Sequence, residues 1–198
     1  GMGRRALKSW LRYGYIPLED SVEEAFRTQE QVSRTLEYAY DDYCVAQVAK
    51  ALNQKKDYET LTRRSHNWVN VLNPRTGWAD GRHANGRWLM NRDLTSRLPF
   101  ITEGAVMHYS FYVPHDIPGL IKAMGGRQSF VHKLDTLFGF RRDGHRDNTY
   151  YYWHGNEPCH HIAYLYALAG EPRKTQLLVS DILRTEYRDV PGGLSGND

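Results

Sequence analysis

Residues 33–52, SRTLEYAYDDYCVAQVAKAL, form the longest periodic stretch in the sequence. Apolar and aromatic side chains recur in it at intervals of three, four or five residues: Leu36, Tyr40, Tyr43 and Val48. This spacing places them near one face of a helix, and neither Gly nor Pro interrupts the pattern. The stretch therefore predicts a long helix and indicates a chain built mainly from helices.

Shorter helical patterns lie on both sides of this stretch. Residues 4–13 precede it, and Ser21 opens a sequence with the form of a capping box. Asp57 is the predicted N-cap of the following helix, which carries apolar residues as far as Leu72 and ends before Pro74. Further helices are predicted after residue 104 and over 117–124, 127–138, 158–169 and 172–187.

The segment between residues 73 and 101 has a different character. Glycines and a proline punctuate it: Gly77, Gly81, Gly86 and Pro99. It predicts a long loop or a small strand pair, and its large aromatic side chains indicate that it is ordered. No internal repeat is visible, so the sequence gives no support to a regular solenoid. The predicted fold class is all-α, with antiparallel helix pairs and this loop or strand pair near 73–101.

The composition excludes several classes of protein. The chain has 26 Lys and Arg against 23 Asp and Glu, and a formal charge of +3 over 198 residues is too weak for a nucleic-acid interface. No apolar run approaches the roughly 20 residues of a membrane span, and the first residues lack the apolar segment of a signal peptide. Cys44 and Cys159 are expected to be two buried free thiols. Aromatic residues, at 13%, suit either the apolar face of a sugar or packing between helices.

Two acidic stretches allow opposed interpretations. Glu37 and Asp41 are four residues apart on one helix face, where they repel unless a cation lies between them, and a solvated face explains them equally well. Glu103 lies among apolar neighbours where a loop enters a helix. Desolvation there would raise the pKa of Glu103 towards the range of a general acid. If Glu103 instead lies in the first turn of the helix, its charge only stabilises the helix through the helix dipole.

Two further stretches carry potential ligands. In VPHDIPG at 113–119, two prolines fix a rigid corner around His115 and Asp116, and Asp116 is either a helix cap or a substrate contact. In HGNEPCHH at 154–161, adjacent histidines rarely ligate one ion, because neighbours on a helix point about 100° apart. The oxygens of Asn156 and Glu157 suit a hard cation such as calcium, or these residues cap the helix that follows.

The order of several short motifs is more specific than any one of them. In sequence order they are YGYIP at 13–17, TLEYAYDD at 35–42, TEG at 102–104, VPHD at 113–116, MGG at 124–126, GNEP at 155–158 and GND at 196–198. This series resembles glycoside hydrolase family 92, the calcium-dependent exo-acting α-mannosidases, many of them α-1,2-specific. The resemblance extends over nearly the whole chain.

The resemblance implies an inverting hydrolysis of terminal mannose on a helical (α/α)6 toroid. Glu103 corresponds to the general acid that protonates the leaving oxygen. Asn156 and Glu157 correspond to a calcium site, and the Ca²⁺ ion would also hold two mannose hydroxyls. The residues expected in or near the sugar pocket are Tyr38, Asp41, Asp42, His115, Asp116 and His154. The implied substrate is a mannose-containing oligosaccharide or N-glycan.

The chain also departs from the family pattern. Family members are several times longer and carry a β-sandwich domain before the toroid, so residues 1–198 are expected to form a partial catalytic domain. The resemblance implies that the catalytic base follows Asn197 and Asp198 in the family motif, so Asp198 is the candidate base in this chain only as a substitute. An inverting site holds its two carboxyls about 6.5–9.5 Å apart, and a terminal residue is expected to hold that distance poorly. After Glu103 the family usually has Asn-Ala-Trp-Gln, where this chain has residues 105–108, AVMH. The isolated chain is therefore expected to be an inactive or impaired glycosidase.

Two other interpretations stay open from the sequence. A non-catalytic carbohydrate-binding or orphan helical fragment fits the departures from the family pattern, whereas a helical interaction module would bind neither calcium nor sugar. An incomplete toroid would expose apolar helix faces, which predicts a homo-oligomer. Bacterial members of the family are commonly exported, but the sequence does not fix the location of this chain.

Overall fold

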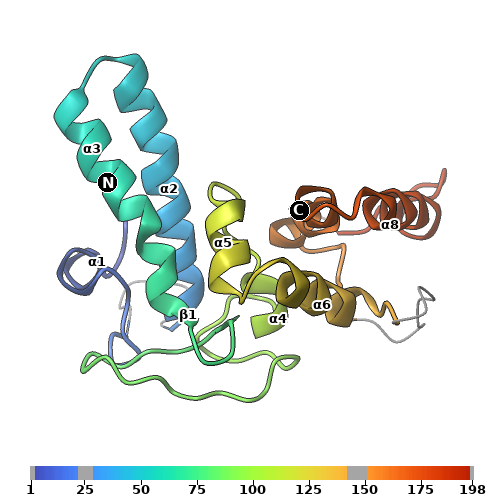
Figure 1. Cartoon of the computed structure of the whole chain (residues 1–198), viewed down its shortest axis with the longest axis horizontal. Helices are drawn as coiled ribbons and strands as arrows, with labels where there is room; N and C mark the ends of the chain where they lie inside the picture. The colour runs from blue at the N-terminus through green and yellow to red at the C-terminus, as the bar shows by residue number, and fades with distance from the viewer. Residues whose placement is uncertain (1–2, 22–28, 142–150, 197–198) are drawn as a thin grey trace. The chain divides into compact units, whose positions relative to one another are not determined.

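The computed structural model describes residues 3–21, 29–141 and 151–196 (Figure 1). The chain divides into two compact units, which we call the N-terminal unit (Gly1–His115) and the C-terminal unit (Asp116–Asp198) and describe separately. Two predictions lie outside the described residues, namely the short helix after Ser21 and the placement of Asp198. The described residues are mostly helical with a single two-stranded sheet, which confirms the predicted all-α class.

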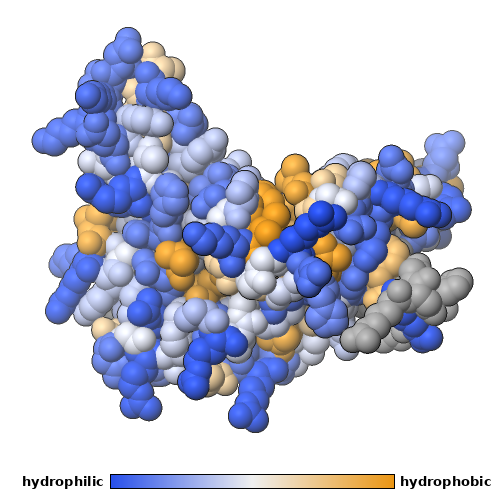
Figure 2. Space-filling view, viewed as in Figure 1, coloured by the Kyte–Doolittle hydropathy of each residue, from blue (hydrophilic) through white to orange (hydrophobic). Residues whose placement is uncertain are grey.

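A helical hairpin dominates the N-terminal unit (Figure 1). Helix α2 (Gln31–Ala51) confirms the helix predicted over 33–52, and α3 (Lys55–Ser65) returns alongside it. Small buried side chains on α2, Ala46 and Ala49, allow the two helices to pack closely. Asn53 makes the tight connection with a φ of 56°, a left-handed conformation that asparagine tolerates. The hairpin tip is exposed and mostly hydrophilic in this view, although Leu52 at the tip is also exposed (Figure 2).

The boundaries of the second hairpin helix differ from the prediction. Asp57 is not its N-cap, because α3 begins at Lys55 and Asp57 lies within its first turn. The helix also does not run to Leu72 as regular α-helix, since the 3₁₀ segment η1 (His66–Val71) follows it directly. The apolar spacing of an α-helix and that of a short 3₁₀ continuation are too similar for the sequence to separate them.

Two short helices, a small hairpin and an ordered loop are the other described elements of the N-terminal unit. The first short helix is α1 (Leu7–Tyr13). The hairpin pairs β1 (Leu72–Asn73) with antiparallel β2 (Trp78–Ala79), which confirms a strand pair at the start of the 73–101 segment. The buried Asp80 carboxylate orders the loop, because it accepts hydrogen bonds from Asn73 Nδ2 at 2.9 Å and from Met90 N at 3.1 Å. The short helix α4 (Val106–Tyr109) then follows.

The C-terminal unit contains five helical segments among its described residues. Three of them match predicted helices: α5 (Ile117–Ala123), α6 (Arg127–Phe138) and α8 (Pro172–Thr185). The helix predicted over 158–169 is instead the 3₁₀ segment η2 (Glu157–Tyr164) followed by the short helix α7 (Leu165–Leu168). Gly170 has a φ of 81° just beyond α7, the left-handed conformation in which glycine commonly ends a helix.

The two cysteines differ in environment. Cys159 is buried, and its burial raises the pKa of the thiol to about 12. Cys44 is exposed on α2, so the expectation of two buried thiols is wrong for this residue. Both thiols are free.

None of the helices in the described part of the chain has the length and hydropathy that a membrane crossing requires.

Candidate active site

Two predicted substrate residues of α2 face the N-terminal segment of their own unit. Tyr38 and Asp42 are four residues apart and therefore lie on one face of the helix. The Tyr38 hydroxyl donates a hydrogen bond to the Arg5 carbonyl at 3.0 Å, and its ring meets the Trp10 ring edge-on, with centroids 6.0 Å apart. Tyr38 is buried, so its observed contacts serve the packing of the N-terminal unit.

Asp42 is bound by two arginines. Its side chain is 1% exposed, and Arg64 donates to both carboxylate oxygens, through Nε at 2.8 Å and Nη2 at 2.9 Å. Arg4 Nη1 donates a third hydrogen bond at 2.6 Å. This carboxylate therefore ties the N-terminal segment and α3 to α2. Asp41 beside it is half exposed, with its Oδ2 3.6 Å from Arg4 Nη2.

A different face of α2 carries a carboxyl group among aromatic rings. Tyr112 donates a hydrogen bond to Glu37, and burial raises the pKa of Glu37 even though this hydrogen bond works in the opposite direction. Tyr40, three residues along the helix, lies edge-on to Tyr112 and nearly parallel to His115, with ring centroids 6.1 and 5.8 Å away. His115 Nε2 donates to the Ser65 carbonyl at 2.9 Å. We call these residues, Glu37, Tyr40, Tyr112 and His115, the Glu37 cluster.

Glu103 lies in a strained turn fixed to the start of α2. The amide of Val32 donates to the Phe100 carbonyl at 3.1 Å, and the Thr102 amide donates to Ser33 Oγ at 2.8 Å. Glu103 follows with a φ of 51°, a left-handed conformation that costs a non-glycine residue about 1–3 kcal/mol. The turn is therefore held by its surroundings.

The environment of Glu103 corrects both sequence interpretations. The residue is exposed although Ile101 and Ala105 are buried, so the expected desolvation among apolar neighbours is wrong. Glu103 is also not in a first helical turn, because α4 begins at Val106 with Ala105 as its N-cap.

In the C-terminal unit, Asp116 caps α5. Its Oδ1 accepts a hydrogen bond from the Gly119 amide at 3.0 Å, which is the capping interpretation that the sequence left open. A substrate contact by Asp116 stays a prediction.

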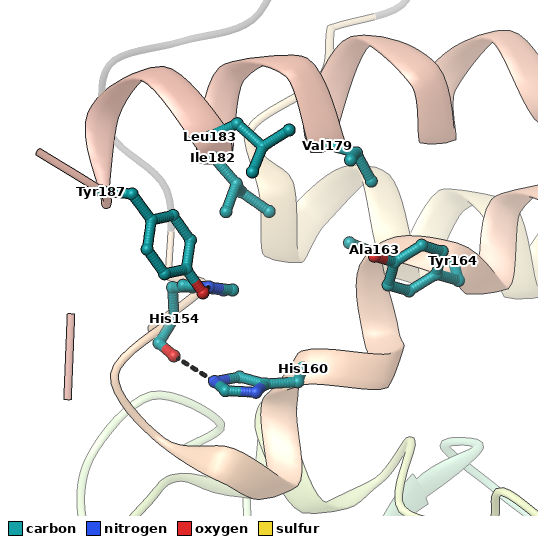
Figure 3. Close-up of a pocket in the computed structure, with 8 residues that line it drawn as sticks. All are labelled: His154, His160, Ala163, Tyr164, Val179, Ile182, Leu183 and Tyr187. Atoms are coloured by element: carbon teal, nitrogen blue, oxygen red, sulfur yellow. Dashed lines mark hydrogen bonds between the residues drawn. The ribbon is translucent and has the colours of Figure 1, made fainter. Parts of the chain in front are cut away.

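His154 lies at one end of a small pocket in the C-terminal unit (Figure 3). Its buried ring is hydrogen-bonded on both nitrogens, Nδ1 to the Tyr152 hydroxyl at 2.8 Å and Nε2 to the Tyr187 hydroxyl at 2.7 Å. The His160 ring stacks on it at 4.6 Å, and burial together with His160 lowers the pKa of His154. The pocket encloses about 180 Å³, and aliphatic side chains of α8 form its opposite wall: Val179, Ile182 and Leu183 (Figure 3).

Asn156 is a buried polar residue with an unused hydrogen-bonding group. It is 3% exposed, and its Nδ2 has no hydrogen-bond partner within the described residues. Asn156 occupies the N-cap position of η2, but its side chain makes no capping hydrogen bond. The capping interpretation is therefore right about the position of Asn156 and not about its side chain. The neighbouring Glu157 is exposed.

This pair fits part of a calcium site. Calcium takes six to eight oxygen ligands, and the amide and carboxylate of Asn156 and Glu157 are of that kind. A buried amide without a partner can turn its oxygen towards an ion. Across residues 3–21, 29–141 and 151–196, no group of three or more His, Cys, Asp or Glu side chains could hold a metal. Backbone carbonyls, water or substrate hydroxyls would therefore have to supply the remaining ligands.

Two motifs that are distant in the sequence meet at Gly155. A Cβ atom added to Gly155 would lie 3.2 Å from the Gly196 nitrogen, and one added to Gly196 would lie 3.0 Å from the Gly155 carbonyl oxygen. Glycine at both positions therefore allows this close backbone contact. It brings the segment that leads to Asp198 against the loop that carries Asn156, although Asp198 itself lies outside the described residues.

The predicted residues thus fall into two groups. Glu103 and the α2 residues belong to the N-terminal unit, and His154, Asn156 and Glu157 belong to the C-terminal unit together with Asp116. Sequence reasoning missed the Glu37 cluster as a unit. The spacing of Glu37 and Tyr40 could have indicated a shared helix face, but nothing in the sequence connects them to Tyr112.

Comparisons with known proteins agree on one family. The family model for the glycosyl hydrolase family 92 catalytic domain matches residues 1–198. A curated protein from Arthroderma benhamiae, described as an uncharacterized secreted glycosidase, is 34% identical over 220 residues that cover 99% of this chain and 27% of that protein.

Solved structures give the same result. The family GH92 α-mannosidase BT3965 from Bacteroides thetaiotaomicron is 38% identical with a TM-score of 0.85, covering 100% of this chain and 25% of its own. Its complex with mannoimidazole matches at 36% identity with a TM-score of 0.86, covering 100% of this chain and 27% of that one. The family GH92 inverting mannosidase BT2199 from the same species is 27% identical with a TM-score of 0.81, over 96% of this chain and 27% of that one.

The chain spans about a quarter of the length of these relatives. Its helices superpose on theirs, which confirms the fold class that the resemblance implied. Because the family model matches every residue of the chain, the protein belongs to glycosyl hydrolase family 92 and carries sequence of its catalytic domain.

Proposed function

We propose that this chain contributes to an exo-acting α-mannosidase that releases terminal α-linked mannose by an inverting, calcium-assisted hydrolysis. The observation that carries the proposal is the match of the entire chain to an α-mannosidase structure solved with mannoimidazole. A mannose-containing oligosaccharide or N-glycan is the corresponding substrate. A secreted location is supported by the description of the fungal relative.

Glu103 is the proposed general acid. Its exposed side chain stands on a turn that hydrogen bonds fix to α2, which suits a group that must meet a glycosidic oxygen in one orientation. Residues 105–108, which depart from the family sequence, are all buried, so the departure alters the packing next to the turn.

The proposed base lies in the motif that ends at Asp198. An inverting hydrolysis needs a second carboxylate that activates a water molecule, about 6.5–9.5 Å from the acid. The contact between Gly196 and Gly155 supports this assignment, since it brings the motif to the loop that carries the other proposed ligands.

Asn156 and Glu157 are the proposed calcium ligands. When bound, the ion would polarise mannose hydroxyls and favour distortion of the sugar ring. The support from this chain is the buried Asn156 amide that lacks a partner and the exposed Glu157 carboxylate next to it. His154, held on both ring nitrogens by tyrosine hydroxyls, presents a fixed ring beside that pair for contact with the sugar.

The Glu103→Gln substitution tests the proposal in the full-length gene product. Glutamine keeps the shape of the side chain but cannot donate the proton, so the rate of mannose release from α-1,2-mannobiose should fall about 10²- to 10⁴-fold. Glu59→Gln is the matched control, because Glu59 is exposed on α3 and makes only a 4.0 Å ion pair with Lys55. An unchanged rate for Glu103→Gln, or no release of mannose by the wild-type protein, would contradict the proposal.

The same assay separates the second candidate function. Binding of mannose, measured by calorimetry, without its release would favour a non-catalytic carbohydrate-binding protein. The observation that favours this second candidate is that the residues after Glu103 depart from the family sequence.

Self-association also stays a prediction. Exposed leucines of the C-terminal unit, Leu168, Leu183 and Leu194, are the apolar side chains that it would cover.

A further inference from the structure

We propose that Glu37 is a further binding residue, whose carboxyl group receives a hydroxyl of the leaving sugar while the half-exposed Tyr40 ring contacts the apolar face of that sugar. The inference rests on the proposed function, because the leaving sugar is defined by the glycosidic oxygen that Glu103 would protonate. Four observations on the N-terminal unit support it.

The first observation is the position of Glu37 relative to Glu103. Ser33 and Glu37 are four residues apart on α2, so they lie on one helix face with a rise of about 6 Å between them. Ser33 Oγ accepts the hydrogen bond from Thr102, the residue directly before Glu103. Glu37 therefore lies about one helical turn from the point where the Glu103 turn is attached.

The second observation is that the fold does not account for the Glu37 carboxyl. No arginine or lysine within the described residues pairs with it, and its one hydrogen bond comes from Tyr112. Asp42 on the same helix is held by two arginines. A half-buried carboxyl without a cation weakens the folded state when it is ionised, and carboxyls of this kind are more frequent at functional sites than elsewhere in a protein.

The third observation is the chemistry of the surroundings. The Tyr40 ring lies 6.1 Å from the Tyr112 ring and 5.8 Å from the His115 ring, centroid to centroid, and Tyr112 donates a hydrogen bond to Glu37. Tyr40 and Tyr112 are half-buried, so part of each ring is accessible. Aromatic surfaces with a few fixed polar groups are typical of small-molecule sites, and a sugar offers both an apolar face and hydroxyl donors.

The fourth observation concerns which sugar is contacted. A general acid donates its proton to the oxygen that joins the two sugars, so residues one turn away on the same helix face are placed for the sugar that leaves with this oxygen. The raised pKa of Glu37 agrees with a carboxyl that is incompletely solvated before substrate binds.

The test compares two substrates that differ only beyond the glycosidic oxygen. Wild-type and Glu37→Gln forms of the full-length gene product are assayed on α-1,2-mannobiose and on an aryl α-mannoside, whose leaving group has no sugar hydroxyls. We expect Glu37→Gln to lower kcat/KM for mannobiose about 10- to 100-fold, mainly through KM, and to leave the aryl mannoside within about twofold. Glu59→Gln should leave both values unchanged, and Tyr112→Phe should reproduce part of the Glu37→Gln effect.

Each result has one meaning. Equal losses on the two substrates, or no loss on either, would overturn the inference while leaving the mannosidase proposal intact. Absence of mannose release by the wild-type protein from both substrates would overturn the proposed function, and the inference with it. Glu37→Gln removes a half-buried ionisable group without a cation and should fold at least as stably as wild type, so thermal unfolding checks that the comparison is made between folded proteins.

Discussion

Asp42 in the N-terminal unit and Asn156 in the C-terminal unit are both buried polar residues from motifs of the family, yet their environments are opposite. Asp42 receives three hydrogen bonds from Arg4 and Arg64. Asn156 keeps an amide nitrogen without a partner among the described residues. Since buried polar groups are nearly always hydrogen-bonded, the fold explains the first residue, whereas the contacts of the described residues do not explain the second.

Two buried asparagines sharpen this comparison, because the side chain is the same. Asn73 Nδ2 donates to Asp80 at 2.9 Å, and Asn73 Oδ1 accepts from the Arg75 amide at 3.0 Å. Asn156 shows no comparable pair of bonds, and its Nδ2 is unpaired within the described residues. If Asn156 serves a ligand, its removal should affect binding more than folding, and the reverse should hold for Asn73.

The largest expected effect on stability comes from Asp42→Ala. Removal of this carboxylate leaves Arg4 and Arg64 beside a buried position, so the free energy of unfolding should fall by about 3 kcal/mol, measured by urea denaturation. Asp41→Ala is the matched control, and it should change stability by less than about 0.5 kcal/mol because Asp41 is half exposed. A loss below about 1 kcal/mol for Asp42→Ala would mean that the arginines are satisfied by water, and Asp42 would no longer count as structural.

The next effect separates the two asparagines. Asn73→Ala leaves the Asp80 carboxylate and the Arg75 amide each short of one hydrogen bond, so it should cost about 2 kcal/mol of unfolding free energy. Asn156→Ala removes a group that already lacks a partner and should cost less than about 1 kcal/mol. Similar losses in the two variants would show that Asn156 is satisfied in the folded chain, and its proposed role as a ligand would then lose its support.

Local patterns account for most of what could be predicted about the fold. The bounds of α6 match the predicted 127–138, because a glycine pair precedes this apolar pattern and Gly139 follows it. The 3₁₀ segments η1 and η2 could not be predicted, since three-residue and four-residue apolar spacings overlap in short stretches.

The candidate site was predicted from the series of family motifs and not from local helical patterns. The motif series pointed to Glu103, Asn156 and Glu157, but it also placed Tyr38 and Asp42 near the sugar, where the structure shows contacts with the N-terminal segment. Those contacts could not be predicted, because Arg4 and Arg64 lie 38 and 22 residues from Asp42 in the sequence. Helical spacing alone gives the face of a side chain, and only the packing of other segments decides what covers that face.

The smallest expected effect concerns Glu37. Its hydrogen bonding is intermediate between that of Asp42 and that of Asn156, because it has one hydrogen-bond partner and no cation. Burial raises its pKa in the folded chain above the usual 4.5, and the charge of Asp41 acts in the same direction. At low pH, Glu37 is protonated in both the folded and the unfolded chain. As the pH rises, Glu37 loses its proton more readily in the unfolded chain, so wild type loses stability until the pH exceeds the raised pKa of the folded chain. Glu37→Gln cannot ionise, so its unfolding free energy relative to wild type should increase from about pH 4.5 upward and then level off above the raised pKa. Urea denaturation across this pH range measures the difference. A difference that shrinks as the pH rises would mean that the Tyr112 hydrogen bond outweighs burial, and Glu37 would then resemble Asp42 rather than Asn156.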